Sequence, residues 1–191
     1  MPVLPILQYP DERLHIVAEP VRSIDREIRK LICDMTETMH AADGIGLAAT
    51  QVDVHRRVVT IDVSPARNDL LVLINPVILQ LGGKAEFHEG CLSVPGVFAT
   101  IKRAGWVKIH ALNHEGRPFA LRAEGLLAMC VQHEVDHLQG MLFVEYLPSL
   151  RRAHISSRLE VESNASHDEG PRARALGAPL TSFVLEHDHG Y

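Results

Sequence analysis

The sequence predicts a single α+β domain, and three observations support this fold class. Two segments carry apolar residues at helical spacing, and several others show the short apolar or alternating pattern of strands. The two kinds of segment do not alternate regularly, as a doubly wound parallel sheet would require. The 191 residues suit one domain with a sizeable core.

The first helix is predicted over residues 24–41, with Ser23 as its N-cap. Cys33 lies near the apolar stripe of this helix, so we expect it in the core. Gly44 and Gly46 then end the helical pattern and predict a glycine-rich loop.

Strands are predicted at 57–63 and 70–74, and the Asn-Pro pair at 75–76 is expected to end the second one. Residues 105–112 alternate apolar and polar side chains, and a turn then leads into a second extended stretch, so 105–122 predicts a hairpin. Helical spacing returns over 124–138, which places the second helix late in the chain.

The chain changes character at about residue 159, where small and helix-breaking residues become frequent. We therefore predict a catalytic domain over 1–158 and a poorly ordered tail over 159–191, in which LTSFVLE is a candidate short strand. The tail carries −4 of the net charge of −5, so the domain is nearly neutral. This balance argues against a general binder of nucleic acid or anionic membranes.

Targeting and redox signals point to the cytoplasm. No apolar run approaches the roughly 20 residues that span a bilayer, and the N-terminus lacks the basic start of a signal peptide. Three cysteines are too few for a disulfide framework, which favours a reducing compartment.

The most informative string is QHEVDH at 132–137, which contains H-E-x-x-H within the second helix. Residues four apart share a helix face, so His133 and His137 could bind one divalent ion while Glu134 reaches its bound water. The alternative is a chance pattern on a solvated helix face, so the motif needs a third ligand.

Two candidates for that ligand fail. The extended protease pattern H-E-x-x-H-x-x-G-x-x-H has Phe143 in place of its third His. Cys130 is on the right helix face but about 10 Å from His137 along the axis, too far for a shared ion, and is better explained by packing. Cys91, on the tight stretch EGCLSVP, remains as the ligand, although a lone Cys usually only packs.

A third string, GIGLAATQ at 44–51, lacks the final glycine and the basic residue of a phosphate loop. Its small residues suit a backbone that approaches a substrate closely, with Gln51 as a hydrogen-bond donor. A packed turn after the first helix is the plainer alternative.

Together, GIGLAATQ, EGCLS and QHEVDH, in that order, resemble the three signature motifs of bacterial peptide deformylases, over about residues 2–155. The resemblance implies the α+β deformylase fold, with strands packed around the H-E-x-x-H helix. It also implies hydrolytic removal of the formyl group from the N-terminal formyl-methionine of newly made chains. The implied cofactor is one divalent ion, usually Fe²⁺, which Zn²⁺, Ni²⁺ or Co²⁺ can replace.

The resemblance also implies roles for individual residues. Cys91, His133 and His137 would hold the metal, which lowers the pKa of a bound water so that the hydroxide attacks the formyl carbonyl. Glu134 would be general base and then general acid.

Oxyanion and substrate contacts follow from the same resemblance. The Gln51 amide and the Leu92 backbone N–H would stabilise the oxyanion. The mainly apolar substrate-binding set would be Ile45, Gly46, Phe87, Glu89, Leu126, Met129 and Cys130.

Two departures from the family leave its surface contacts open. Val97-Phe98-Ala99 lacks the Arg that many members have near the mouth of the site, so we assign no charge there. Arg151, Arg152, His154 and Arg158 keep the basic start of a helix that docks some members on the ribosome; docking is therefore a hypothesis.

Two other functions remain as alternatives. A metallopeptidase could use H-E-x-x-H, although an upstream Cys ligand argues against it. A non-enzymatic, metal-stabilised peptide-binding module is disfavoured because Glu134 and Gln51 are both present. Asp136, inside the motif, is expected to pair with a cation such as Arg103 or to lie exposed.

Overall fold

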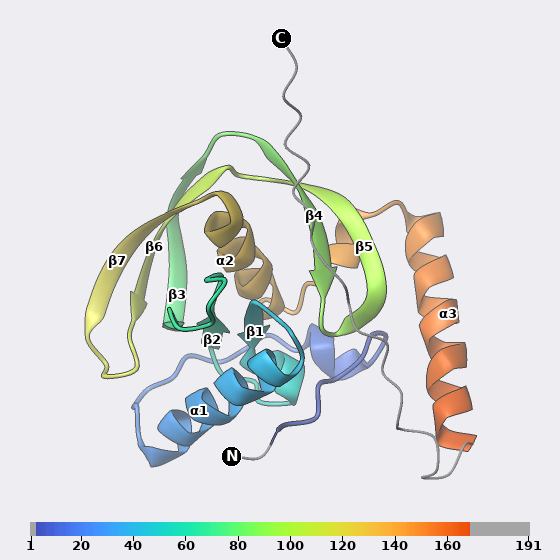
Figure 1. Cartoon of the computed structure of the whole chain (residues 1–191), viewed down its shortest axis with the longest axis horizontal. Coiled ribbons are helices and arrows are strands. Elements are labelled where there is room, and N and C mark those ends of the chain that lie inside the picture. Colours follow the sequence, from blue (N-terminus) through green and yellow to red (C-terminus); the bar gives the residue numbers. More distant parts are fainter. Residues whose placement is uncertain (1–2, 169–191) are drawn as a thin grey trace.

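The computed structural model describes residues 3–168 of the chain. Its main sheet is antiparallel, in the order β1-β2-β3-β6-β7 (Figure 1). These strands are β1 (Gly46–Ala48), β2 (Val58–Ile61), β3 (Leu71–Gly82), β6 (Trp106–Leu112) and β7 (Pro118–Glu124). A second, two-stranded sheet is the hairpin of β4 (Ala85–Cys91) and β5 (Val94–Arg103).

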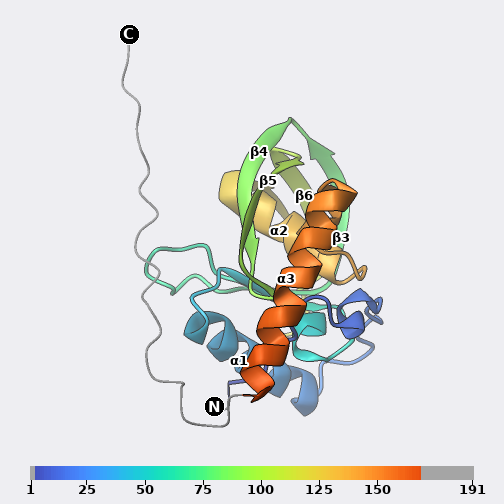
Figure 2. The ribbon, with the colours of Figure 1, turned by 90° about the vertical axis from the view of Figure 1, so that its right-hand side faces the viewer.

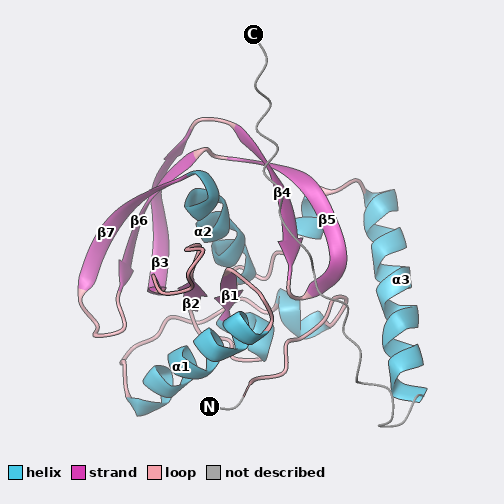
Figure 3. Cartoon of the chain, in the orientation of Figure 1, coloured by secondary structure: helices cyan, strands magenta, loops and turns pink. Residues whose placement is uncertain are grey.

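Helices fill and flank the space between the two sheets (Figure 3). They are α1 (Arg26–Ala41), α2 (Gly125–His137), α3 (Ser149–Asp168) and the short 3₁₀ helices η1 (Glu12–His15), η2 (Ala49–Val52) and η3 (Phe143–Tyr146). Figure 1 shows α2 between the main sheet and the β4–β5 hairpin. Figure 2 shows α3 running along the outer side of that hairpin. This is the predicted α+β fold with strands around the H-E-x-x-H helix.

The core forms where α2 meets the main sheet. Ala128 and Val131 of α2 are fully buried and belong to the same apolar cluster as Leu73 and Ile109 of β3 and β6. Burying a large aliphatic side chain contributes about 1.5–3 kcal/mol, so this packing fixes the helix that carries both motif histidines. The predicted second helix and the 105–122 hairpin are both confirmed.

The first helix begins later than predicted. Asp25, not Ser23, is its N-cap: the Asp25 carboxylate accepts hydrogen bonds from the backbone N–H groups of Glu27 and Ile28 at 3.0 Å each. An Asp at this position also complements the positive end of the helix dipole. The expectation for Cys33 was wrong, because its side chain is exposed, whereas Met35 is fully buried.

The predicted loop over 44–51 is confined to Gly44 and Ile45. Gly46–Ala48 is strand β1, paired with β2, and the four residues that follow form η2. The small residues Gly46, Ala48 and Ala49 are buried, and their size suits this close packing.

Asn75-Pro76 does not end a strand either. β3 continues to Gly82, with a register irregularity between Ile74 and Val77 that absorbs the proline. Asn75 has a positive φ of 52°, and its side chain bonds both the N–H and the C=O of Val21 at 2.8 Å. These two bonds tie the bulge to the segment that precedes α1, while the backbone N–H of Asn75 donates to the Arg57 carbonyl oxygen at 2.8 Å.

The hairpin of β4 and β5 was not predicted. Its alternation is visible in the buried faces of Val97, Ala99, Ile101 and Arg103, but glycines interrupt the sequence pattern on both strands. Arg103, the last buried residue of β5, is charged, and this also obscures the alternation of apolar and polar residues.

The C-terminal helix α3 continues to Asp168, beyond residue 159 where the tail was expected to begin. Most of the predicted tail, including LTSFVLE, lies outside the described residues, so the division at 158 stays a prediction. Among residues 3–168, no helix combines the length and apolarity needed to cross a membrane.

Candidate metal centre

The two motif histidines lie side by side on the buried face of α2. The ring centroids of His133 and His137 are 4.9 Å apart with the planes at 78°, and both residues are almost inaccessible to solvent. This is the arrangement expected of positions i and i+4 on one helix face.

The β4–β5 hairpin brings Cys91 to this face. Cys91 ends β4, and its Sγ lies 3.2 Å from Nε2 of His137. One donor atom from each of Cys91, His133 and His137 lies within 4.8 Å of the others, and no second such group occurs among residues 3–168. A thiolate and two imidazoles fit a divalent ion such as Zn²⁺ or Fe²⁺, and three protein ligands leave a coordination position open.

Burial sets the charge of the site. Burial lowers the pKa of His137 well below its usual range, and the neighbouring His133 acts in the same direction, so this imidazole is held in its neutral, metal-binding form. Burial alone would lower the pKa of His133 too, but hydrogen bonds to Cys91 and Glu89 raise it. A metal ion must therefore compete with a proton for His133.

Glu134 is a buried carboxylate beside the three donors. Burial raises its pKa to about 7, and its Oε2 has no hydrogen-bond partner in the described part of the chain. Gly46 makes room for it: a Cβ there would lie 2.3 Å from Oε1 of Glu134. A carboxyl group that is balanced between its two forms near neutral pH is suited to accept and return a proton.

Gln51 is held in η2 with its amide aimed at the same place. Its Oε1 accepts a hydrogen bond from the Ala48 N–H at 2.8 Å, which orients the side chain. Its Nε2 lies 3.1 Å from Oγ of Ser93 and 3.5 Å from Sγ of Cys91. Leu92 follows Cys91 in the turn between the two strands and is partly buried.

Behind His133 lies a charged network that the sequence showed only in part. Nδ1 of His133 is 3.0 Å from Oε2 of Glu89, whose carboxylate also accepts from Nε and Nη2 of Arg103 at 2.7 and 2.9 Å. Nη1 of Arg103 donates to Asp136 at 2.6 Å, which confirms the expected pair. The Tyr146 hydroxyl donates a hydrogen bond to the same Asp136 oxygen at 2.9 Å.

Glu89 and Tyr146 have roles that sequence reasoning missed. Burial alone would raise the pKa of Glu89, but the Arg103 guanidinium and His133 hold it below its usual range. Glu89 is thus an ionised partner of a candidate ligand, and its place in the substrate pocket stays a prediction. The only sequence signal was a Glu two residues before the Cys on an alternating strand, which places both side chains on one face.

Of the other predicted substrate residues, Leu126, Met129 and Cys130 lie on the first half of α2, Ile45 directly precedes β1, and Phe87 lies on β4. Ile45 and Leu126 expose 38% and 48% of their surface, so they are available to an incoming side chain. Phe87 is half-buried, while Met129 and Cys130 are buried. Sγ of Cys130 lies 3.6 Å from the Ile45 carbonyl oxygen, and burial raises its thiol pKa, as expected for a packed thiol that binds no metal.

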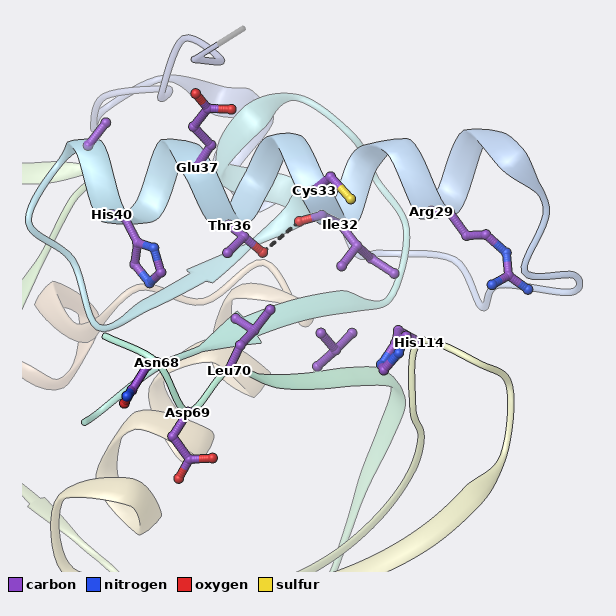
Figure 4. Close-up of a pocket in the computed structure, with 12 residues that line it drawn as sticks. Arg29, Ile32, Cys33, Thr36, Glu37, His40, Asn68, Asp69, Leu70 and His114 are labelled. Carbon is purple, nitrogen blue, oxygen red and sulfur yellow. Dashed lines mark hydrogen bonds between the residues drawn. The ribbon is translucent and has the colours of Figure 1, made fainter. Parts of the chain in front are cut away.

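A separate cavity of about 1220 Å³ lies beside α1, away from these donors. Figure 4 shows α1 on one side, with Ile32 and His40, and the segment carrying Asn68 to Leu70 on the other. None of the predicted site residues lines this cavity. Its size therefore says nothing about the metal centre, which is a tightly packed group of side chains.

Comparison with known proteins agrees with the geometry. The family described as polypeptide deformylase matches residues 3–153. A peptide deformylase of Neisseria meningitidis is 57% identical over 160 residues, which cover 84% of this chain and 96% of that protein.

Solved structures give the same result. A peptide deformylase from Legionella pneumophila has a TM-score of 0.83 and 42% identity, and covers 88% of this chain and 99% of its own. One from Ehrlichia chaffeensis in complex with actinonin has a TM-score of 0.82 and 40% identity, and covers 85% and 98%.

Proposed function

This chain belongs to the polypeptide deformylase family and is therefore an enzyme, and we propose that it removes the formyl group from the N-terminal formyl-methionine of new polypeptides with a divalent metal ion. The observation that carries the proposal is the convergence of three donor atoms, from Cys91, His133 and His137, within 4.8 Å and beside the buried Glu134. Neither a protease extension nor a second cluster competes with it among the described residues.

Cys91, His133 and His137 would hold the ion. Fe²⁺ is the ion we propose for the cell, with Zn²⁺, Ni²⁺ or Co²⁺ able to take its place. When bound, such an ion lowers the pKa of water and polarises a carbonyl group. The donor set supports a cofactor of this class because one thiolate and two imidazoles suit all four ions.

Glu134 would handle the proton of the reaction. Its carboxylate takes a proton from the attacking water and then gives it to the leaving amine nitrogen. In the metal-free chain the carboxyl has a pKa of about 7, so neither of its forms is strongly preferred at neutral pH.

Gln51 and Leu92 would stabilise the negative charge that develops on the formyl oxygen. The Ala48 N–H holds Oε1 of Gln51, so that Nε2 of the same amide is directed toward Cys91. A preorganised donor of this kind is worth on the order of 10²–10³ in rate.

The methionine side chain would lie against the apolar residues near the start of α2. Ile45 and Leu126 are exposed and Met129 is buried, and apolar residues of this kind suit a flexible thioether. We propose that Phe87, Gly46 and Cys130 complete this pocket and that the peptide backbone pairs along β1 as an added strand, which places few demands on the later residues.

The decisive test is formate release from a formyl-Met-Ala-Ser peptide, run beside a casein cleavage assay. We expect formate without casein cleavage, loss of activity after chelation, and recovery with Fe²⁺ or Co²⁺ under anaerobic conditions. Actinonin should inhibit, since the Ehrlichia chaffeensis relative was crystallised with it. Casein cleavage would favour a peptidase. A metallated protein that binds the peptide but releases no formate would favour a binding module.

We place this reaction in the cytoplasm, where formyl-methionine chains emerge. Ribosome docking through α3 is the last part of the proposal. Arg151 and Arg158 already donate to the carbonyls of Phe98 and Pro95 on the β5 side, so Arg152 is the residue changed in the test. Co-sedimentation with ribosomes, compared between the parent and Arg152→Glu, tests it. No binding by the parent would remove the idea.

A further inference from the structure

Tyr146 and Asp136 form the outer end of a hydrogen-bonded chain that leads inward to a candidate metal ligand. The chain starts at the Tyr146 hydroxyl, passes through Asp136 and Arg103, and ends with Glu89 against Nδ1 of His133. Every link is between 2.6 and 3.0 Å. Its members come from η3, α2, β5 and β4, so the chain ties four elements together.

The middle of this chain is buried and charged. The side chains of Glu89 and Arg103 expose 0% and 4% of their surface, while that of Asp136 exposes 19%. A buried guanidinium between two carboxylates stays fixed only when its donors are satisfied in good geometry. All three guanidinium nitrogens are used: Nε and Nη2 on Glu89, and Nη1 on Asp136.

Tyr146 closes the outer side of Arg103. The guanidinium carbon lies 4.9 Å from the centre of the Tyr146 ring, within the range of a cation–π contact. The hydroxyl of the same residue holds Asp136, so a single side chain restrains both the cation and its second carboxylate. Tyr146 itself is 47% exposed, and nothing in the core requires a phenol there.

We propose that Tyr146 and Asp136 are positioning residues for the metal centre: through Arg103 they hold Glu89 in place, and so fix the orientation in which His133 offers Nε2 to the ion. This inference rests on the proposed function, since it assumes that His133 binds metal. Partners that orient a ligating His are worth about 10–100-fold in metal affinity when lost.

The test measures metal affinity directly, by titrating the metal-free full-length chain with Co²⁺ in competition with a chelator. Tyr146→Phe keeps the ring and removes only the hydroxyl, and we expect it to raise the Kd for Co²⁺ by about three- to tenfold. Asp136→Ala should raise it by about 10–100-fold, and Asp136→Asn, which keeps an acceptor oxygen, should recover part of the loss. The visible absorption of bound Co²⁺ should shift in the same order.

A matched control separates positioning from general destabilisation. Arg122→Gln removes another aromatic–guanidinium contact, 4.1 Å from the Trp106 ring, together with an ion pair to Glu124, both distant from the donors. It should leave the Kd and the Co²⁺ spectrum unchanged, whatever it does to the melting temperature.

The outcomes are distinct. If the parent binds one Co²⁺ per chain and Tyr146→Phe and Asp136→Ala bind it equally tightly with the same spectrum, the positioning role is wrong and the proposed function stands. If the parent binds no Co²⁺, the metal-dependent function itself fails. A higher Kd for Co²⁺ in both variants, with one ion still bound per chain, supports the inference.

Discussion

Replacing Gly46 by Ala should disable the proposed proton carrier without touching the metal ligands. Gly46 has no positive φ, so the residue is small for reasons of space alone. An added Cβ would lie 2.3 Å from Oε1 of Glu134 and 2.7 Å from Sγ of Cys130. Both neighbours are buried on α2, so neither can swing into solvent.

The structure sets the size of the effect. The Glu134 carboxylate would have to retreat by about 0.7 Å to restore even a 3.0 Å contact. A misplacement of about 1 Å costs roughly 10²-fold in rate, and overpacking of this kind costs about 1–3 kcal/mol of folding free energy. We therefore expect kcat for formate release to fall about 100-fold, with a modestly lower Tm.

The assay is formate release from a formyl-Met peptide, together with metal content per chain and a thermal melt. Gly105→Ala is the matched control, since its added Cβ would make only ordinary contacts, the nearest at 3.8 Å to Ala85. A Gly46→Ala enzyme that keeps kcat within threefold of the parent would refute the packing argument. Loss of the metal from Gly46→Ala would also refute it, because the substitution would then have disturbed the metal ligands and not Glu134 alone.

Three further outcomes follow from the site and its surroundings. Glu134→Ala should still bind one metal ion per chain but lose nearly all formate release; substantial turnover by the metallated variant would contradict its role. In metal-free protein, Glu89→Gln should lower the unfolding free energy by on the order of 3 kcal/mol at neutral pH. The pKa of Glu89 is depressed in the fold, so its stabilisation is complete above about 4.5 and is lost as the pH falls through the lower folded value. Melting curves should therefore converge in acid, and a constant gap would contradict the pairing. Iodoacetamide should modify exposed Cys33 quickly and without loss of formate release, while buried Cys130 resists, as peptide mass mapping can show.

The sequence predicted the parts of this site that depend on local spacing. The i, i+4 geometry of His133 and His137 follows from the helix itself, and Cys91 was found because the pair lacked a third ligand. Asp136 was expected to meet a cation such as Arg103, and does.

What the sequence could not give depends on contacts between distant segments. The Glu89–Arg103 pair needs the β4–β5 register, and that hairpin went unrecognised because glycines and charged residues break its pattern. Tyr146 is ten residues from Asp136, on a separate short helix, and no local period relates the two. The N-cap is Asp25 and not Ser23, because residue propensities predict the first residue of a helix only to within one or two positions.

The separation of the β4–β5 hairpin from the main sheet has one more consequence. An isolated two-stranded hairpin is barely stable in water, and this one meets α2 at the point where Cys91 lies beside His137. An ion held by Cys91 and the two histidines would act as a cross-link that closes a loop of roughly 40 residues, as a disulfide does in secreted proteins. In a cell that lacks the ion, the chain would then be less stable as well as inactive. It would also be degraded faster by proteases.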